Sequence, residues 1–132
     1  MVTRNSGGKR YSLLLVNPKR KYRYNWDLQE LCQIMGKRTA VHPLALPTIA
    51  AMTPDHYDIT ILDEEMEPMR SEAAPDIVGL TALGSNVTRA YEIADQFRAM
   101  GTAVVMGGAQ ALVPGYKSNN GNWLQIVVFW FV

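Results

Sequence analysis

The sequence predicts an α/β fold with a doubly wound, mainly parallel sheet, on the strength of three observations. Four short segments, at residues 11–16, 57–62, 76–81 and 102–106, have the length and composition of strands. Segments of helical periodicity separate the first run from the second and the third from the fourth, as in βαβ units. With 132 residues, 48% hydrophobic and 19% charged, the chain suits one folded domain.

The first half of the chain supplies a strand, a long connection and a crossover helix. The run from Tyr11 to Val16 is nearly unbroken and stops at Asn17-Pro18, which is typical of a strand buried on both faces. Residues 19–43 form a long connection with a short helix inside it, marked by Leu28, Leu31, Ile34 and Met35 before Gly36. A helix of about ten residues follows, marked by Leu44, Leu46, Ile49, Ala50 and Met52, with Pro47 in its first turn.

The second half supplies three strands and the strongest helical pattern. Residues 57–62 alternate apolar and polar side chains, which favours a half-buried or edge strand. Residues 64–75 are acidic and contain two prolines, so any helix there is short and distorted. The third strand, 76–81, leads through the loop 82–86 into a helix over 87–100 that Gly101 stops, with Ser85 or Asn86 as its cap. The fourth strand runs into Gly107-Gly108.

The last part of the chain departs from this alternation of strands and helices. Residues 108–124 have no apolar period that would form the crossover helix of a fifth unit. Leu124 to Val132 has strong strand propensity and is apolar on both faces from Val127 onward. We expect this segment to add to the sheet or to drive self-association. The expected organisation is a disordered extension at 1–10, a domain at 11–113 and an atypical apolar tail at 114–132.

Charge is segregated along the chain. Residues 1–42 carry nine Lys/Arg and two acids, a net charge of +7, and the remainder carries −6. The basic segment either pairs with the acidic run Asp63, Glu64, Glu65 and Glu67 or binds a phosphate-bearing partner. Tyr22, Tyr24 and Trp26 among the bases resemble a base-stacking strip, although a loop folded over the sheet needs the same residues. We favour the pairing and keep weak nucleic-acid binding as an alternative.

The sequence lacks the residues that several classes of chemistry require. Cys32 is the only cysteine, so neither an internal disulfide nor a cysteine-ligated metal cluster can form within this chain. No GxGxxG or GxxxxGK[ST] motif is present, and His42 and His56 form no local metal pair. The acidic run could supply acid and base groups, but a solvated turn is the commoner fate of such residues. Without a signal core or a membrane-length apolar run, we expect a cytoplasmic protein with no membrane partner.

The candidate binding residues follow from the sheet. In open parallel sheets, ligands bind outside the carboxyl ends of the strands. The candidates in the loops that begin there are Asn17, Pro18, Thr81, Ala82, Leu83, Ser85, Asn86, Gly107 and Gly108. Each residue also has a purely structural interpretation, as a strand end, a helix cap or a tight turn.

Five segments in order resemble the amino-terminal cobalamin-binding domain of radical S-adenosylmethionine enzymes. The segments are Val16-Asn17-Pro18, Pro43 to Ala51, Ile61 to Glu64, Asp76 to Ala82 and Val104 to Gly108. The resemblance implies a Rossmann-like sheet that holds cobalamin over its carboxyl edge. It implies that Thr81, Ala82 and Leu83 lie near the nucleotide tail of the cofactor and that Gly107-Gly108 make room for it.

Two departures from the family pattern shape the expected function. The Asp-x-His-x-x-Gly motif is missing after the first strand, where Asn17-Pro18-Lys19-Arg20 stands, so cobalamin would bind without a protein histidine ligand. The Cys-x-x-x-Cys-x-x-Cys motif of the catalytic domain is also missing, and the chain leaves the family pattern near Pro114, as a truncated or frame-shifted copy would. We therefore expect a cobalamin-binding module that is not an enzyme by itself and whose partner is a catalytic radical S-adenosylmethionine domain. The alternative is a cofactor-free remnant or interaction module.

Overall fold

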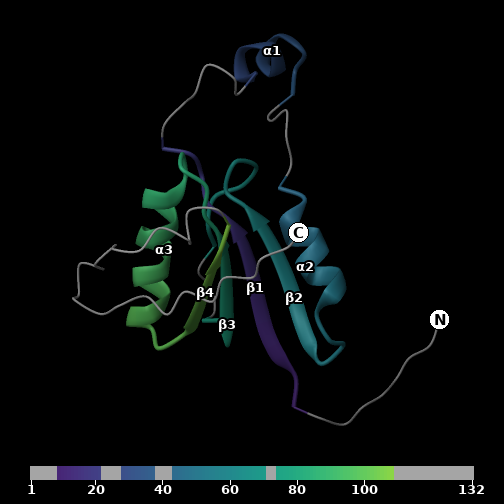
Figure 1. The fold of residues 1–132 in the computed structure, drawn as a ribbon, viewed down its shortest axis with the longest axis vertical. Helices are drawn as coiled ribbons and strands as arrows, with labels where there is room; N and C mark the ends of the chain where they lie inside the picture. Colours follow the sequence, from purple (N-terminus) through teal and green to yellow (C-terminus); the bar gives the residue numbers. More distant parts are fainter. Residues whose placement is uncertain (1–8, 22–27, 38–42, 71–73, 109–132) are drawn as a thin grey trace, which may run out of the picture.

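A computed structural model describes residues 9–21, 28–37, 43–70 and 74–108 of the chain. Its centre is a four-stranded, all-parallel sheet with the strand order β2-β1-β3-β4 (Figure 1). The strands are β1 (Tyr11–Asn17), β2 (Tyr57–Asp63), β3 (Ile77–Thr81) and β4 (Ala103–Gly107). This arrangement confirms the predicted Rossmann-like α/β class, and each strand lies within one residue of its expected position.

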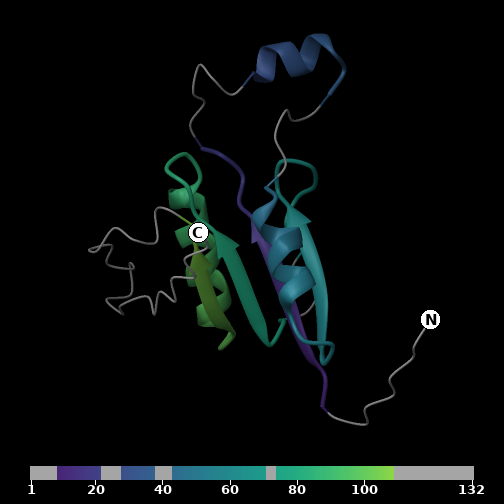
Figure 2. The ribbon, with the colours of Figure 1, turned by 45° about the vertical axis from the view of Figure 1, so that its right-hand side comes forward.

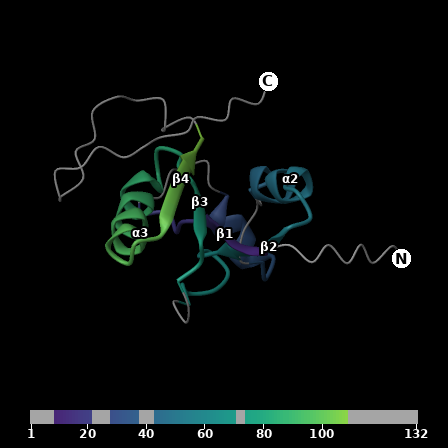
Figure 3. The same ribbon diagram turned by 90° about the horizontal axis from the view of Figure 1, so that it is seen from below.

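Helices cover both faces of the sheet. Helix α2 (Ala45–Met52) contacts β1 and β2, and helix α3 (Val87–Ala99) contacts β3 and β4. The chain moves from β1 to β2 in one direction and from β3 to β4 in the other, so right-handed crossovers place the two helices on opposite faces. Figure 3 shows α2 and α3 on the two sides of the sheet.

The main core lies between the sheet and α3. The even-numbered residues of β3 and β4 point to this side and meet the apolar stripe of α3. Its fully buried members include Val16, Val78, Ile93, Phe97 and Met106, each exposed by 2% or less. The predicted helix over 87–100 is therefore confirmed, and its apolar period is the stripe that packs on the sheet.

The opposite face of the sheet is covered unevenly. Leu46 of α2 is buried against β1 and β2, and Leu15 reaches over the neighbouring strand to Gly79, where an added Cβ would lie 2.7 Å from it. Beyond Gly79, the side chains of Ile77 and Val105 are only partly buried. The described helices thus protect the β1–β2 half of this face and leave the β3–β4 half less covered.

Helix α1 (Gln29–Ile34) lies beyond the carboxyl ends of the strands, apart from the sheet (Figures 1 and 2). Gly36 follows it with φ of +66°, which fits the predicted glycine stop. The pattern that predicted this helix marks residues that stay in solvent here. Leu31, Ile34 and Met35 are 50%, 83% and 59% exposed.

Several expectations fall outside the described residues. These are residues 1–8 of the extension expected at 1–10, the aromatic residues Tyr22, Tyr24 and Trp26, His42, the end of the expected domain from 109 to 113, and the tail at 114–132. Within the acidic segment, residues 64–66 form a turn, in which the amides of Met66 and Glu67 donate to the Asp63 carbonyl over 2.9 and 3.0 Å. None of the helices in the described ranges is long and apolar enough to cross a membrane.

Candidate functional site

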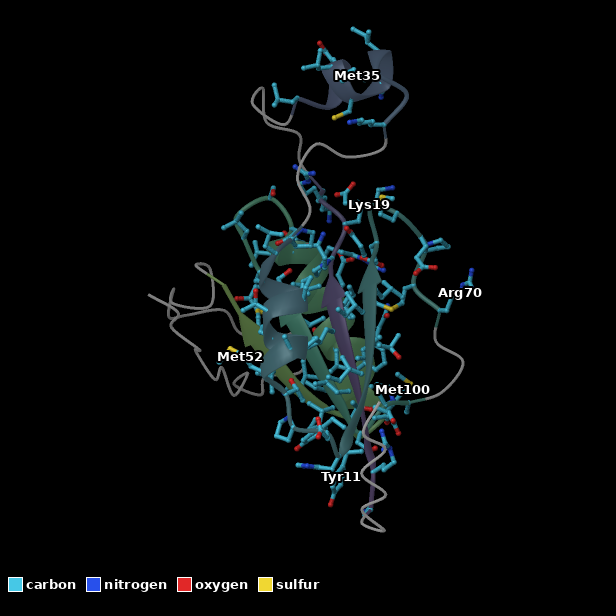
Figure 4. All side chains as sticks on the ribbon, turned by 90° about the vertical axis from the view of Figure 1, so that its right-hand side faces the viewer. Tyr11, Lys19, Met35, Met52, Arg70 and Met100 are labelled. Carbon is cyan, nitrogen blue, oxygen red and sulfur yellow. The ribbon has the colours of Figure 1, made fainter. Side chains whose placement is uncertain are left out.

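The strand order reverses between β1 and β3, and this is where open α/β sheets bind ligands. β1 is followed along the chain by β2 on one side, while β3 and β4 lie on its other side. The carboxyl ends of all four strands meet at one edge, and Figure 4 shows Lys19 near this edge and Tyr11 at the opposite end of the sheet. The candidate residues follow these four ends.

One row of residues crosses the sheet at this edge, and we call it the carboxyl row. It consists of Asp63, Asn17, Thr81 and Gly107, the last residues of their strands, in the order of the strands in the sheet. All four belong to the face that α2 partly covers, because their neighbours Val16, Leu62, Leu80 and Met106 point into the α3 core.

Asn17 joins three strands through its side-chain amide. Its Nδ2 donates to Asp63 Oδ1 over 2.9 Å, and its Oδ1 accepts from the Thr81 hydroxyl over 3.2 Å. The carboxyl row is therefore a hydrogen-bonded chain from β2 through β1 to β3. The chain ends at Thr81, and at Gly107, the next residue of the row, an added Cβ would meet no described atom within 4 Å.

The side chain of Asn86 fixes the loop from β3 to α3 through its hydrogen bonds. Asn86, one of the two predicted cap residues, stands at the N-cap position of α3, but its side chain makes no capping hydrogen bond. Its Oδ1 accepts from the Leu83 amide over 2.7 Å, and its Nδ2 donates to the Pro18 carbonyl over 3.3 Å. The side chain cannot also reach the first amides of the helix, because it bridges the β3 and β1 loops.

The two glycines after β4 have different surroundings. Gly108 has φ of +106°, and a Cβ there would lie 2.4 Å from the Ala82 carbonyl oxygen. The Ala82 amide in turn donates to the Gly107 carbonyl over 2.8 Å, so the loops after β3 and β4 are in direct contact. Gly108 is thus required by the backbone of the protein itself, whereas a Cβ at Gly107 would meet no atom of the described residues within 4 Å.

On the α3 side, the same edge is closed by a group of ion pairs that we call the clasp: Arg89 with Glu64, Arg20 with Glu65, and Lys21 with Glu92. Arg89 binds Glu64 through two hydrogen bonds of 2.7 and 3.1 Å, and the Glu64 side chain is only 5% exposed. The pairing of Arg20 with Glu65 confirms, for these residues, that the basic segment pairs with the acidic run.

The clasp also fixes the backbone that follows β1. The amide of Lys19 donates to Glu64 over 3.0 Å, and the amide of Arg20 donates to Glu65 over 2.8 Å. Burial acts to raise the pKa of Glu64, but the hydrogen bonds from Arg89 and from the Lys19 amide outweigh it and hold this pKa below its usual value. Glu64 is therefore a structural carboxylate and not the solvated turn residue that the sequence predicted.

An open groove of about 760 Å³ lies beside the clasp. Its walls carry charges of both signs that pair with one another, and they include none of the predicted binding residues. A ligand there would compete with ion pairs that are already formed. The end of the carboxyl row at Gly107, which the described residues leave uncovered, is the better candidate.

The structure brings most of the predicted binding residues together at this edge. Asn17, Pro18, Thr81 and Asn86 are joined by hydrogen bonds, and Ala82 contacts the loop of Gly107 and Gly108. Leu83 differs from the buried residues beside it, since 62% of its surface is exposed. Its apolar side chain is thus available to a ligand above the edge.

The described residues contain no cluster of three or more His, Cys, Asp or Glu that could hold a metal ion. His56 precedes β2 at the other end of the sheet, where its carbonyl accepts from the Tyr11 amide over 3.1 Å. His56 therefore lies away from the carboxyl edge.

Sequence reasoning missed Arg89, the central residue of the clasp. A cation in the first turn of a helix opposes the helix dipole, and α3 has no acidic residue there to offset it. That unfavourable position is the signal that an anionic partner lies nearby, and Glu64 is that partner.

Comparisons with known proteins give one informative match. No model of a known protein family matches the chain, and no solved structure matches it. A bacteriochlorophyllide d C-8(2)-methyltransferase from Chlorobaculum tepidum is 39% identical over 66 residues, which make up 49% of this chain. The match spans only 15% of the length of that relative.

Proposed function

We propose that residues 11–113 form a cobalamin-binding module, similar to the amino-terminal domain of radical S-adenosylmethionine enzymes, which works together with a catalytic domain of that kind. The observation that carries the proposal is the open end of the carboxyl row. There the hydrogen-bonded side chains stop at Thr81, and Gly107 leaves space, among the described residues, above a partly covered sheet face.

The residues at this end fit a large, flat ligand with polar substituents. Gly107 adds no side chain, and Leu83 offers an exposed apolar surface beside it. The Thr81 hydroxyl donates to Asn17 and keeps its lone pairs for an amide of the ligand. Small residues for close approach, with a few placed polar groups, are typical of cofactor sites.

The relative adds independent support. It is a methyltransferase, and cobalamin, when bound, would supply the chemistry of methyl-group transfer. In this proposal the chain binds and orients the cofactor, and it supplies no histidine ligand to cobalt. Asn17 and Asn86 act as positioning residues, because their side chains hold Thr81 and the loop of Leu83 in place.

The test is retention of hydroxocobalamin by the full chain after desalting, followed by visible absorbance. We expect the unaltered chain to keep the corrinoid and Gly107→Trp to lose it, because the indole would fill the space that the ligand needs. The matched control is Ala103→Trp, on the same strand and the same face but exposed at the opposite end of the sheet. It should bind as the unaltered chain does.

Circular dichroism of both variants separates loss of the site from loss of the fold. A folded Gly107→Trp variant that still retains the corrinoid would contradict the proposed position. If the unaltered chain retains none, the cofactor-free interaction module becomes the better explanation. A His56→Ala variant should leave the visible spectrum of the bound corrinoid unchanged, since this histidine lies at the far end of the sheet.

A further inference from the structure

Strand β4 has an open edge in the described part of the chain. It pairs with β3 on one side, and β2 and β4 are the two outer strands of the sheet. An unprotected outer strand is a template for another strand, and proteins usually cover or disrupt such an edge. Within Ala103–Gly107 there is no proline and no charged side chain that would disrupt it.

The register shows which groups β4 offers to an added strand. The Gly107 carbonyl accepts from the Ala82 amide, so Gly107 and the alternate residues Val105 and Ala103 direct their amides and carbonyls toward β3. The amides and carbonyls of Val104 and Met106 therefore point outward. The edge has two donors and two acceptors with no partner strand among the described residues.

The chain also contains a segment that needs such an edge. Residues 124–132, LQIVVFWFV, carry no charge and are rich in β-branched and aromatic residues. When a segment of this composition pairs in a sheet, its apolar side chains are removed from water and its backbone amides and carbonyls form hydrogen bonds.

The connection is long enough for either strand direction. Fifteen residues, 109–123, separate the described end of β4 from this segment. They can span about 50 Å when extended, roughly three times the length of a five-residue strand. A parallel return needs a connection of about a dozen residues, and an antiparallel return needs fewer.

We propose that residues 124–132 pair with the outward edge of β4 as a fifth strand of the same molecule. The segment is tethered to β4 by these fifteen residues, so its effective concentration at this edge is in the millimolar range and exceeds that of a second copy in dilute solution. This pairing does not depend on the proposed binding of cobalamin.

Amide hydrogen exchange of the full ¹⁵N-labelled chain tests the pairing at the two outward amides. We expect the amides of Val104 and Met106 to exchange about a hundredfold more slowly than those of an unstructured peptide, because paired amides exchange only when the strand opens. Their protection should not change with protein concentration. Nuclear Overhauser contacts should join these amides to protons of residues 124–132.

A tail variant sharpens the test. Neighbouring amides of a strand point to opposite edges, so Val127→Pro combined with Val128→Pro removes at least one donor that would face β4. Protection at Val104 and Met106 should then fall at least about tenfold, while Val105, which faces β3, stays protected. The control, Ser118→Pro with Asn119→Pro, places the same residues in the connection and should change neither.

Three results would overturn the proposal. One is fast exchange of Val104 and Met106 in the unaltered chain. Another is protection that appears only at high protein concentration, which would assign the edge to a second copy. The third is the absence of Overhauser contacts to the tail, and this readout does not depend on whether the proline variant folds.

Discussion

At the scale of single residues, two adjacent glycines have separate roles. Gly108 is fixed by its positive φ and by the Ala82 carbonyl, and Gly107 borders the space where we place a ligand. A sequence shows only the pair, because a glycine required by the backbone and a glycine required by a ligand look the same in it. Variants at the two positions should therefore behave differently.

We expect Gly108→Ala to destabilise the fold more than Gly101→Ala. Both glycines have positive φ, +106° and +79°, but a Cβ at Gly101 meets nothing within 4 Å. Gly101→Ala should thus cost about 1–2 kcal/mol for the backbone conformation alone. Gly108→Ala adds the contact with Ala82, and chemical denaturation should show the larger loss. Equal losses would mean that the two loops separate freely.

The clasp gives a prediction about pH at the same scale. Because the pKa of Glu64 is lowered in the folded state, its stabilisation is present above its unfolded pKa near 4.5 and is lost as the pH falls through the folded pKa. Glu64→Gln should cost about 1.5–3 kcal/mol at pH 7. Urea unfolding at a series of pH values should show that the difference from the unaltered chain shrinks below pH 4.5.

The control for this prediction is a second arginine–carboxylate pair. Arg10 also binds its partner, Asp58, through two nitrogens, but both side chains are more than half exposed. Water screens such a pair, so Asp58→Asn should change the stability much less than Glu64→Gln. A similar loss in both variants would show that the burial of Glu64 contributes nothing.

At the scale of elements, the strands and helices were predictable because each carries its own local signal. The apolar runs of β1, β3 and β4 and the period of α3 are patterns within a few consecutive residues. The clasp and the bridge by Asn86 join residues that are far apart in the sequence. Composition places acids and bases in the chain, but only the topology decides which of them meet.

Helix α2 depends on one side chain for its attachment to the sheet. Leu46 is 1% exposed, and no other residue of α2 is buried. Leu46→Ala should therefore cost about 2–5 kcal/mol, as expected for a buried leucine. Leu44→Ala, at the start of the same helix and 77% exposed, should change the stability by less than about 0.5 kcal/mol. Comparable losses in urea unfolding would mean that α2 is not packed through Leu46.

At the scale of the whole molecule, the carboxyl row connects the two halves of the doubly wound sheet. The β1–β2 half packs on α2, and the β3–β4 half packs on α3. Asn17 lies between them, with hydrogen bonds to Asp63 on one side and to Thr81 on the other. An amide side chain suits position 17, because its nitrogen donates to the Asp63 carboxylate and its oxygen accepts from the Thr81 hydroxyl.

Asn17→Asp should disturb this connection in a pH-dependent way. The new carboxylate would face the Asp63 carboxylate across the present 2.9 Å contact, and two like charges that close cannot both ionise without cost. We expect a loss on the order of 2–4 kcal/mol at pH 7. The folded state would raise the pKa of the pair, so the loss should diminish as the pH falls through the raised value.

The double variant Asn17→Asp with Asp63→Asn distinguishes repulsion from a general loss of packing. It restores one amide and one carboxylate at the contact, with the donor now on β2, while position 17 keeps an oxygen that can accept from Thr81. If repulsion is the cause, urea unfolding at pH 7 should show that the double variant recovers most of the stability. A double variant as unstable as Asn17→Asp would mean that the row requires the amide at position 17 itself. The two halves of the sheet would then be joined by the geometry of Asn17 and not by the balance of charge across the row.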